Sequence, residues 1–213
     1  YPAIIFEQER EAGNQILNVD NLTYSFDNDI LFKKINFSLM KSDKVVLFSK
    51  DSRAIKAFYE ILEGSLVADK GKFEWGITTK KAFLPSENDS YFKGEISLID
   101  WLRQYSKSDE EKEEVFIRGF LGKMLFSGDE ALKNVNVLSG GEKVRCMLSK
   151  IMMEKANVLL INEPTNHLDL ESITAFNNSL KNYKGTLIFS TSDHTFAQTL
   201  GNRIIELTPN GVI

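Results

Sequence analysis

The sequence predicts an α/β fold that combines an antiparallel β section, a central parallel or mixed sheet and a helical section. Residues 16–26 and 30–40 are rich in β-branched and aromatic side chains, and the turn-forming Asp27-Asn28-Asp29 between them indicates a hairpin. Residues 96–153 have a helical pattern. Three short apolar runs are typical of buried strands, and the last two of parallel ones: Lys44–Phe48, Val158–Ile161 and Thr186–Phe189.

The remaining elements follow from the same signals. A helix is expected at Arg53–Glu63 and a crossover helix at Ser172–Tyr183. The acidic run Asp109–Glu111 predicts the first turn of another helix. That helix would carry an apolar stripe of Val115, Phe116 and Phe120. Further short strands are expected at Lys72–Trp75, Ala82–Leu84, Arg203–Leu207 and Gly211–Ile213.

The composition is that of an ordinary soluble globular domain. Hydrophobic residues make up 42% and charged residues 26% of 213 positions. The net charge of −4 argues against direct DNA binding by this chain, because phosphate contacts need a basic face. The single cysteine, Cys146, excludes an internal disulfide framework and is compatible with a reducing compartment, so we expect a cytoplasmic location. No apolar run approaches the roughly 18 residues of a membrane span.

The N-terminal residues are typical of a linker. The chain begins with Tyr1-Pro2-Ala3-Ile4, which contains neither an initiator Met nor the basic start of a signal peptide. We therefore expect a fragment of a longer protein. The polar stretch Glu7–Gln15 is interpreted as the end of a linker that leads into the first strand.

The strongest motif is Leu138-Ser139-Gly140-Gly141-Glu142, which opens a predicted helix that runs to Met153. Free backbone N–H groups, the positive end of the helix dipole and a hydroxyl converge at such a position, and glycine lets a phosphate approach closely. Taken alone, the motif is also compatible with an ordinary helix cap, and that interpretation is favoured for an isolated S-G-G-E.

A second motif follows the first. Asn157–Asp169 reads N-V-L-L-I-N-E-P-T-N-H-L-D, an apolar strand that ends in polar residues, as in α/β sheets that present groups to a ligand. Together, L-S-G-G-E and E-P-T-N-H-L-D resemble the motifs of the ATP-binding-cassette (ABC) ATPases. The N-H-L-D ending is similar to that of the ABC-F family, whose members carry two cassettes in one chain. The resemblance extends from Phe6 to Ile213.

The resemblance implies a domain organisation. Residues 1–15 would be the end of the linker between two cassettes, and residues 16–213 would form the second, C-terminal cassette with a P-loop NTPase-like ABC ATPase fold. A helical signature subdomain would occupy roughly residues 90–153. The expected partner is the N-terminal cassette of the same polypeptide, arranged head to tail.

The family's phosphate-binding loop has the pattern G-x-x-x-x-G-K-[ST], in which backbone N–H groups hold the phosphates and the lysine and hydroxyl serve phosphate and Mg²⁺. Ser49 and Ala54 stand at the two glycine positions, and Ser52 stands where the family usually has another glycine. Ile55 stands for the lysine and Lys56 for the hydroxyl. The phosphate loop is therefore predicted to be degenerate.

Three other positions of the same site also depart from the family pattern. Asn162 stands at the Walker B aspartate, Ser86 at the Q-loop glutamine and Ser192 at the switch histidine. Glu163, the usual water-polarising carboxylate, remains, and we expect it to be idle. ATP and Mg²⁺ are implied as cofactors by the resemblance, with weak or no binding in this domain's own site.

The retained motifs belong to a different site. In ABC proteins the signature of one cassette covers the ATP bound to the other. The resemblance therefore assigns Ser139, Gly140, Gly141 and Glu142 to the partner's ATP, and Asp169 to the loop that couples the two sites.

Simpler interpretations stand beside these assignments. One of Lys50, Arg53 and Lys56 could replace the lost lysine, but a solvated polar loop is favoured. Lys56 is disfavoured because one residue along a helix turns its side chain by about 100°. Lys50 would have to fold back against the competing carboxylate of Asp51. Phe26 occupies the position that stacks on adenine, or is simply a half-buried sheet residue. The remaining candidates are interpreted as structural: His194 as a surface residue at a helix start, His167 as part of the N-H-L-D loop and not a metal ligand, and Cys146, Trp75 and Trp101 as packing residues.

Three functions are compatible with these observations. The first is a degenerate half of a composite ABC-F ATPase that works in translation. The second is a ribosome- or partner-docking module in which nucleotide is incidental. The third, the ATP-binding subunit of a membrane transporter, is weaker, because Ser86 replaces the glutamine of the loop that touches membrane domains.

Overall fold

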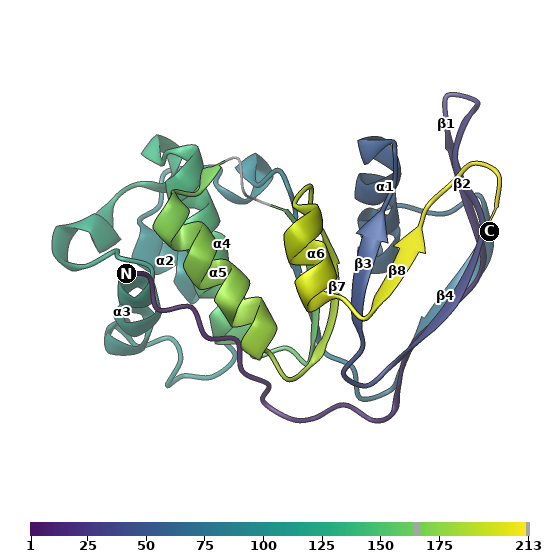
Figure 1. Cartoon of the computed structure of the whole chain (residues 1–213). Coiled ribbons are helices and arrows are strands. Elements are labelled where there is room, and N and C mark those ends of the chain that lie inside the picture. Colours follow the sequence, from purple (N-terminus) through teal and green to yellow (C-terminus); the bar gives the residue numbers. More distant parts are fainter. Residues whose placement is uncertain (164–166, 212–213) are drawn as a thin grey trace. The chain divides into compact units, whose positions relative to one another are not determined.

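The computed structural model of the chain describes residues 1–163 and 167–211. It divides into two compact units. We call Gln8–Pro85, Ala156–Glu163 and Lys184–Ile213 the sheet unit, and Tyr1–Glu7, Ser86–Lys155 and Pro164–Tyr183 the helical unit. Most of their helices and strands are labelled in Figure 1.

An antiparallel sheet in the order β2-β1-β4 forms one part of the sheet unit. Its strands are β1 (Gln15–Phe26), β2 (Asp29–Met40) and β4 (Lys70–Trp75). The hairpin between β1 and β2 turns on Asp27 and Asn28, whose φ angles of 48° and 65° are those of a two-residue hairpin turn. The predicted hairpin is confirmed.

A five-stranded parallel sheet in the order β5-β6-β7-β3-β8 forms the other part. Its register pairs β6 with β7 and β7 with β3, so the three predicted apolar runs lie side by side as buried central strands. The predicted α/β fold with an antiparallel β section is confirmed. The strands are β3 (Lys44–Phe48), β5 (Lys81–Leu84), β6 (Val158–Asn162), β7 (Thr186–Ser190) and β8 (Arg203–Glu206).

Helix α1 (Ser52–Glu63) joins the two sheets through a shared apolar core. Phe58 of α1 packs edge-on against Phe32 of β2, with ring centroids 5.8 Å apart. Tyr59, on the same helix, is fully buried and stacks on Phe83 of β5. The short helix α6 (His194–Leu200) also belongs to this unit, and His194 is exposed at its start, as predicted.

The helical unit contains α2 (Leu98–Arg103), α3 (Glu114–Lys123), α4 (Gly140–Glu154) and α5 (Leu170–Asn182), with 3₁₀ turns at Asp89–Tyr91, Gly128–Leu132 and Val135–Val137. Helices α2, α3 and α4 pack against one another. Trp101 is buried and stacks on Phe92, which confirms its packing role. Cys146 is buried in α4, as predicted.

Two predictions differ from the structure at the residues that it describes. The acidic residues Asp109–Glu111 precede α3 in turns, because the helix begins only at Glu114. Its buried face consists of Ile117 and Leu121, four residues apart, while Val115 is exposed. At the C-terminus, Gly211 has a φ of 87° and lies outside any strand. Residues 212 and 213 of that predicted strand lie outside the described residues.

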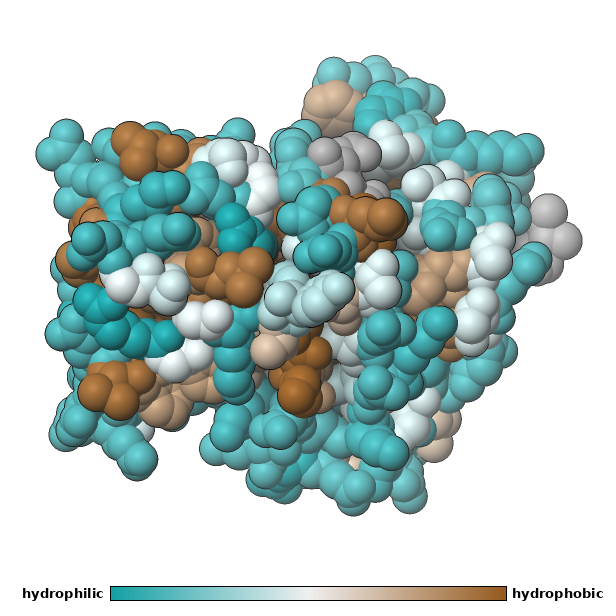
Figure 2. Space-filling view, turned by 60° about the vertical axis from the view of Figure 1, so that its left-hand side comes forward, coloured by the Kyte–Doolittle hydropathy of each residue, from teal (hydrophilic) through white to brown (hydrophobic). Residues whose placement is uncertain are grey.

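Exposed apolar side chains are scattered over the surface of both units. In the face shown in Figure 2, apolar residues form small patches that are separated by polar ones. Within residues 1–163 and 167–211, no helix has the length and apolar character that a membrane crossing requires.

Candidate functional site

The loop between β3 and α1 is closed by its own side chains. Asp51 caps α1: its Oδ1 accepts a hydrogen bond of 3.0 Å from the backbone N–H of Arg53. Ser49 Oγ in turn accepts the backbone N–H of Asp51 at 3.1 Å. A carboxylate therefore lies at the N-terminus of α1, where the helix dipole favours negative charge.

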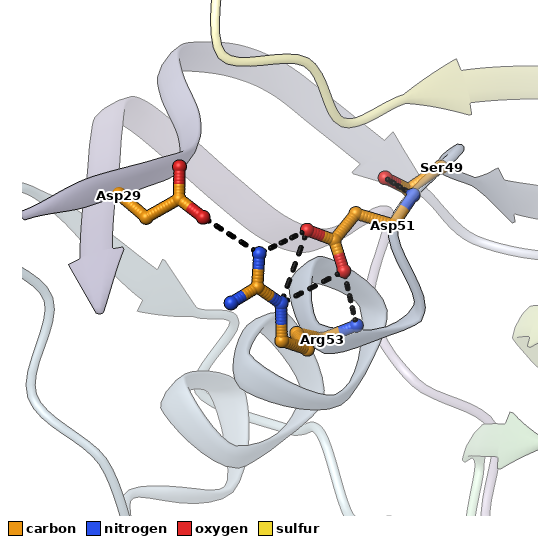
Figure 3. A network of polar contacts seen from close by, with 4 residues as sticks. All are labelled: Asp29, Ser49, Asp51 and Arg53. Carbon is orange, nitrogen blue, oxygen red and sulfur yellow. Dashed lines mark hydrogen bonds and ion pairs between the residues drawn. The ribbon is translucent and has the colours of Figure 1, made fainter. Parts of the chain in front are cut away.

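Arg53 folds over this carboxylate, as Figure 3 shows. Its Nη2 lies 2.8 Å from Asp51 Oδ2 and 2.8 Å from Asp29 Oδ2, on β2 of the hairpin. The side-chain hydrogen bonds from Arg53, followed by its backbone N–H, lower the pKa of Asp51. The same contacts raise the pKa of the Arg53 guanidinium. The loop therefore holds one guanidinium between two carboxylates.

The other positions of this loop differ in burial. Ile55, at the lysine position, packs against the apolar core of the sheet unit. Ala54, at a glycine position, is completely buried. Lys50 and Lys56 are exposed, as is Ser52. In this loop Arg53 is therefore bound to carboxylates, and Ile55 packs against the core.

A neutral hydrogen-bond network lies at the carboxyl ends of β6 and β7. Ser190 Oγ donates to Asn162 Oδ1 at 3.0 Å. Beneath them, the hydroxyl of Tyr59 donates to the carbonyl of Ile161 at 2.8 Å. Burial raises the pKa of Tyr59, so the phenol stays neutral. The amide oxygen of Asn162 therefore has a partner within the protein, and no charge is present at this position.

Glu163 is held by the loop that follows β7. Its Oε1 accepts from Thr191 Oγ1 at 3.0 Å, and its Oε2 accepts from the backbone N–H of Ser192 at 2.6 Å. Thr191 Oγ1 also accepts the backbone N–H of Asp193. Sequence reasoning considered Ser192 for its side chain and missed Thr191, because nothing in the local pattern joins it to a carboxylate 28 residues earlier.

Phe26 and Ser86 lie in different units. Phe26 is the last residue of β1, is 51% exposed and pairs with Asp29, the residue that binds Arg53. The hairpin that carries Phe26 is therefore tied to the start of α1. Ser86 is half-buried and opens the helical unit after β5.

The signature residues form a closed cap at the start of α4. Ser139 Oγ accepts the backbone N–H of Glu142 at 3.2 Å, and Glu142 Oε1 accepts the backbone N–H of Ser139 at 3.1 Å, which is a capping box. Lys133 Nζ lies 2.6 Å from Glu142 Oε2. Burial opposes ionisation of Glu142, but Lys133 and the Ser139 N–H together leave its pKa lowered.

Both carboxylate oxygens of Glu142 have partners within the helical unit, Lys133 and the Ser139 N–H. Its assignment to the partner's ATP stays a prediction. Sequence reasoning missed Lys133, because its ion pair forms only after the 3₁₀ turns bring it back to α4.

Asp169 caps α5. Its Oδ1 accepts the backbone N–H of Ser172 at 2.7 Å, which is the main reason why the pKa of Asp169 is lowered. The Arg145 guanidinium contributes to the same shift. His167, two residues earlier, lies against Gly140 and Gly141. Pro164, Thr165 and Asn166 of the predicted motif lie outside the described residues.

The comparisons with known proteins agree with this architecture. The sequence profile of the family described as ABC transporter matches residues 53–166, so the chain belongs to this family. Fold and motifs together define the class as an ABC ATPase cassette. A solved structure of an ATP-binding subunit of an ABC transporter superposes with a TM-score of 0.75 at 16% identity, covering 92% of this chain and 88% of that one.

Curated relatives match the chain along almost its full length. The chain is 50% identical over 214 residues to the ABC transporter ATP-binding protein YkpA of Bacillus subtilis, covering 100% of this chain and 39% of YkpA. It is 29% identical over 209 residues to ABC transporter F family member 5 of Arabidopsis thaliana, with 96% and 29% covered. It is 28% identical over 204 residues to the energy-dependent translational throttle protein EttA of Escherichia coli K12, with 94% and 36% covered. The chain thus spans less than two fifths of the length of these relatives.

Proposed function

We propose that the chain is the C-terminal cassette of an ABC-F type ATPase, with a degenerate site of its own and a signature that completes the site of a partner cassette. The ABC-F assignment is supported by the N-H-L-D ending and by the relative named as an F family member. Two cassettes in one chain are compatible with the fraction of the relatives that this chain spans.

The degenerate site is supported by the charges at the start of α1. A bound triphosphate needs free amides and cations, but the Asp51 carboxylate takes the Arg53 N–H, and the Arg53 guanidinium is shared with Asp29. Two carboxylates would repel the phosphates. Asn162 offers no charge for Mg²⁺ and its oxygen accepts from Ser190. These residues do not fit MgATP, so we assign no catalytic step to this site.

The partner role is supported by the start of α4. The helix is capped by the Ser139 hydroxyl and begins with two glycines, and the Glu142 carboxylate of its first turn, which accepts the Ser139 N–H, is paired with Lys133. The first amides of a helix of this length, together with the Ser139 hydroxyl, suit an incoming phosphate. This difference between the two helix starts is the observation that carries the proposal.

The test is steady-state ATP hydrolysis by the full-length protein that contains this cassette. Ser139→Arg places a bulky cation at the signature, and we expect it to reduce turnover by on the order of 10²-fold or more. Glu163→Gln changes the retained carboxylate of the degenerate site, and we expect less than a twofold effect. A tenfold loss in Glu163→Gln with an unaffected Ser139→Arg enzyme would reverse the assignment.

We further propose that the ATPase works in translation. EttA is named as a translational throttle protein, and this chain matches it along 94% of its own length. The net charge of −4 does not favour RNA binding by this cassette, so ribosome contacts would come from other parts of the protein. Co-sedimentation of the full-length protein with ribosomes, with and without ATP, tests this role: recovery only in the supernatant under both conditions contradicts it.

A further inference from the structure

One residue, His167, limits the space above both glycines of the signature. A Cβ added to Gly140 would lie 2.7 Å from His167 Nδ1 and 3.2 Å from its Cγ. A Cβ added to Gly141 would lie 2.5 Å from the backbone carbonyl oxygen of His167. All of these residues belong to the helical unit. The imidazole ring and the carbonyl of His167 therefore cover the first turn of α4.

This contact explains why glycine stands at both positions. Neither Gly140 nor Gly141 is among the glycines with positive φ, so their backbone conformation is open to any residue. Glycine at a helical position is about 1 kcal/mol less favourable than alanine, so two in succession need a reason. The close approach of His167 supplies one that does not depend on a ligand.

His167 stands just before the start of α5. Two residues later, Asp169 caps that helix by accepting the Ser172 N–H, which fixes the backbone that leads from His167 into α5. On α4, Lys143 of the first turn forms an ion pair of 2.8 Å with Asp89. All of these residues belong to the helical unit.

We infer that His167 is a positioning residue for the signature: its ring and carbonyl set the direction in which the first amides of α4 face the partner's ATP. The inference rests on the proposed function. It assigns His167 no contact with nucleotide. A displacement of about 1 Å in a positioning group costs up to 10²-fold in rate, so loss of the ring changes turnover through the geometry of Gly140 and Gly141.

The test is a double-mutant cycle in the full-length protein, with His167→Ala, Gly140→Ala and the combination. We expect His167→Ala to lower kcat about tenfold with a smaller change in KM for ATP, because the signature is aligned in the closed state. Gly140→Ala should lower kcat by at least as much in the wild-type background. In the His167→Ala background the added methyl finds space, so its further effect should be less than threefold.

Two controls complete the design. His194→Ala removes the other histidine of the chain, which is exposed in the sheet unit, and should leave kcat unchanged. His167→Asn retains a planar polar group and should recover most of the loss. Thermal unfolding of each variant confirms that it is folded. If Gly140→Ala does not fold, the comparison of kcat between His167→Ala and His167→Asn still tests the inference.

Two results would overturn the inference: an unchanged kcat in His167→Ala, or equal effects of Gly140→Ala in both backgrounds. The second would mean that the ligand, and not His167, requires the glycine. The proposed function fails separately, when Ser139→Arg leaves ATP turnover unaffected. In that case none of the variants in the double-mutant cycle changes ATP turnover. If only the His167 inference fails, Ser139→Arg still lowers ATP turnover.

Discussion

Helices α1 and α4 both begin with a side-chain cap, but they present opposite chemistry to an incoming anion. Helix α1 is capped by the carboxylate of Asp51, which is covered by Arg53. Helix α4 is capped by the hydroxyl of Ser139, and the Glu142 carboxylate, which accepts the Ser139 N–H, is paired with Lys133. The backbone dipole is the same in both, so the side chains decide whether the helix start accepts an anion.

The comparison also concerns space. At α1 the glycine position holds Ala54, whose side chain is completely buried in the sheet unit. At α4 the glycines are overlain by His167, which leaves no room for a side chain. At the start of α1 the space is filled by a side chain of the helix itself. At the start of α4 it is limited by His167, which lies outside the helix. Substitutions in opposite directions should therefore be harmful at the two helices.

The largest effect is expected at Gly141. Gly141→Ala places a methyl 2.5 Å from the His167 carbonyl, so the backbone must shift, and we expect the free energy of unfolding to fall by about 2–3 kcal/mol. Gly119→Ala is the matched control, because a Cβ there meets nothing within 4 Å in α3, and it should stabilise by about 0.5–1 kcal/mol. Urea unfolding of the three proteins measures both changes. Equal effects at the two glycines would contradict the close approach.

The reverse substitution is predicted to be harmful at α1. Ala54→Gly restores the family's glycine but removes a buried methyl and adds backbone freedom, so we expect a loss of about 1–2 kcal/mol. Ser52→Gly, at an exposed position two residues earlier, serves as control and should cost less than about 1 kcal/mol. Chemical denaturation compares them. If Ala54→Gly raised the free energy of unfolding, the loop backbone would be strained by the alanine, and the family's glycine would relieve that strain.

The caps themselves are expected to contribute about equally. Ser139→Ala removes the acceptor for the Glu142 N–H and should cost about 1 kcal/mol, with Ser139→Thr recovering most of it. Asp51→Ala should cost a similar amount at pH 7. Thermal unfolding under one set of conditions gives both values. A cost of several kcal/mol at either position would show that the residue does more than cap its helix.

The smallest expected effect is the pH dependence of the stability that the Asp51 cap contributes. Hydrogen bonds from Arg53 lower the pKa of Asp51 below 3.8, so its folded-state pKa lies below the unfolded one. Such a carboxylate contributes stability above the unfolded pKa and loses it as pH falls through the folded value. Asp51→Ser keeps a cap that does not titrate. Because the carboxylate is exposed, the free energy of unfolding of the wild-type protein should exceed that of Asp51→Ser by about 0.5 kcal/mol at pH 7. This difference should disappear as the pH falls below 3.8. A difference that grows on acidification would contradict this sign.

Much of the fold could be predicted, because its signals are local. The hairpin, β3, β6 and β7 each follow from a short run of side chains. The helix cap at Ser139 was also predicted, as the favoured interpretation of the isolated motif, and the structure adds the reciprocal bond from Glu142 that makes it a capping box. Helix α3 was misjudged because its apolar residues lie on several faces, and only packing selects Ile117 and Leu121 for burial.

The partners of the site residues could not be predicted, because they are far apart in the chain. Asp29 meets Arg53 only when the hairpin folds against α1, and Thr191 meets Glu163 only when β6 and β7 pair. Tyr59 shows no polar role in its local pattern, yet its hydroxyl supports the carbonyl of Ile161.

The sequence by itself determined the family, the order of the elements and which residue types stand at each motif position, because these depend on local composition and spacing. Tertiary structure decided where each charge is directed. It paired Arg53 with two carboxylates, paired Glu142 of the capping box with Lys133 and placed His167 over the signature glycines. The physical reason is that a hydrogen bond, an ion pair or a steric contact acts over a few ångströms, and only folding brings distant residues within that range.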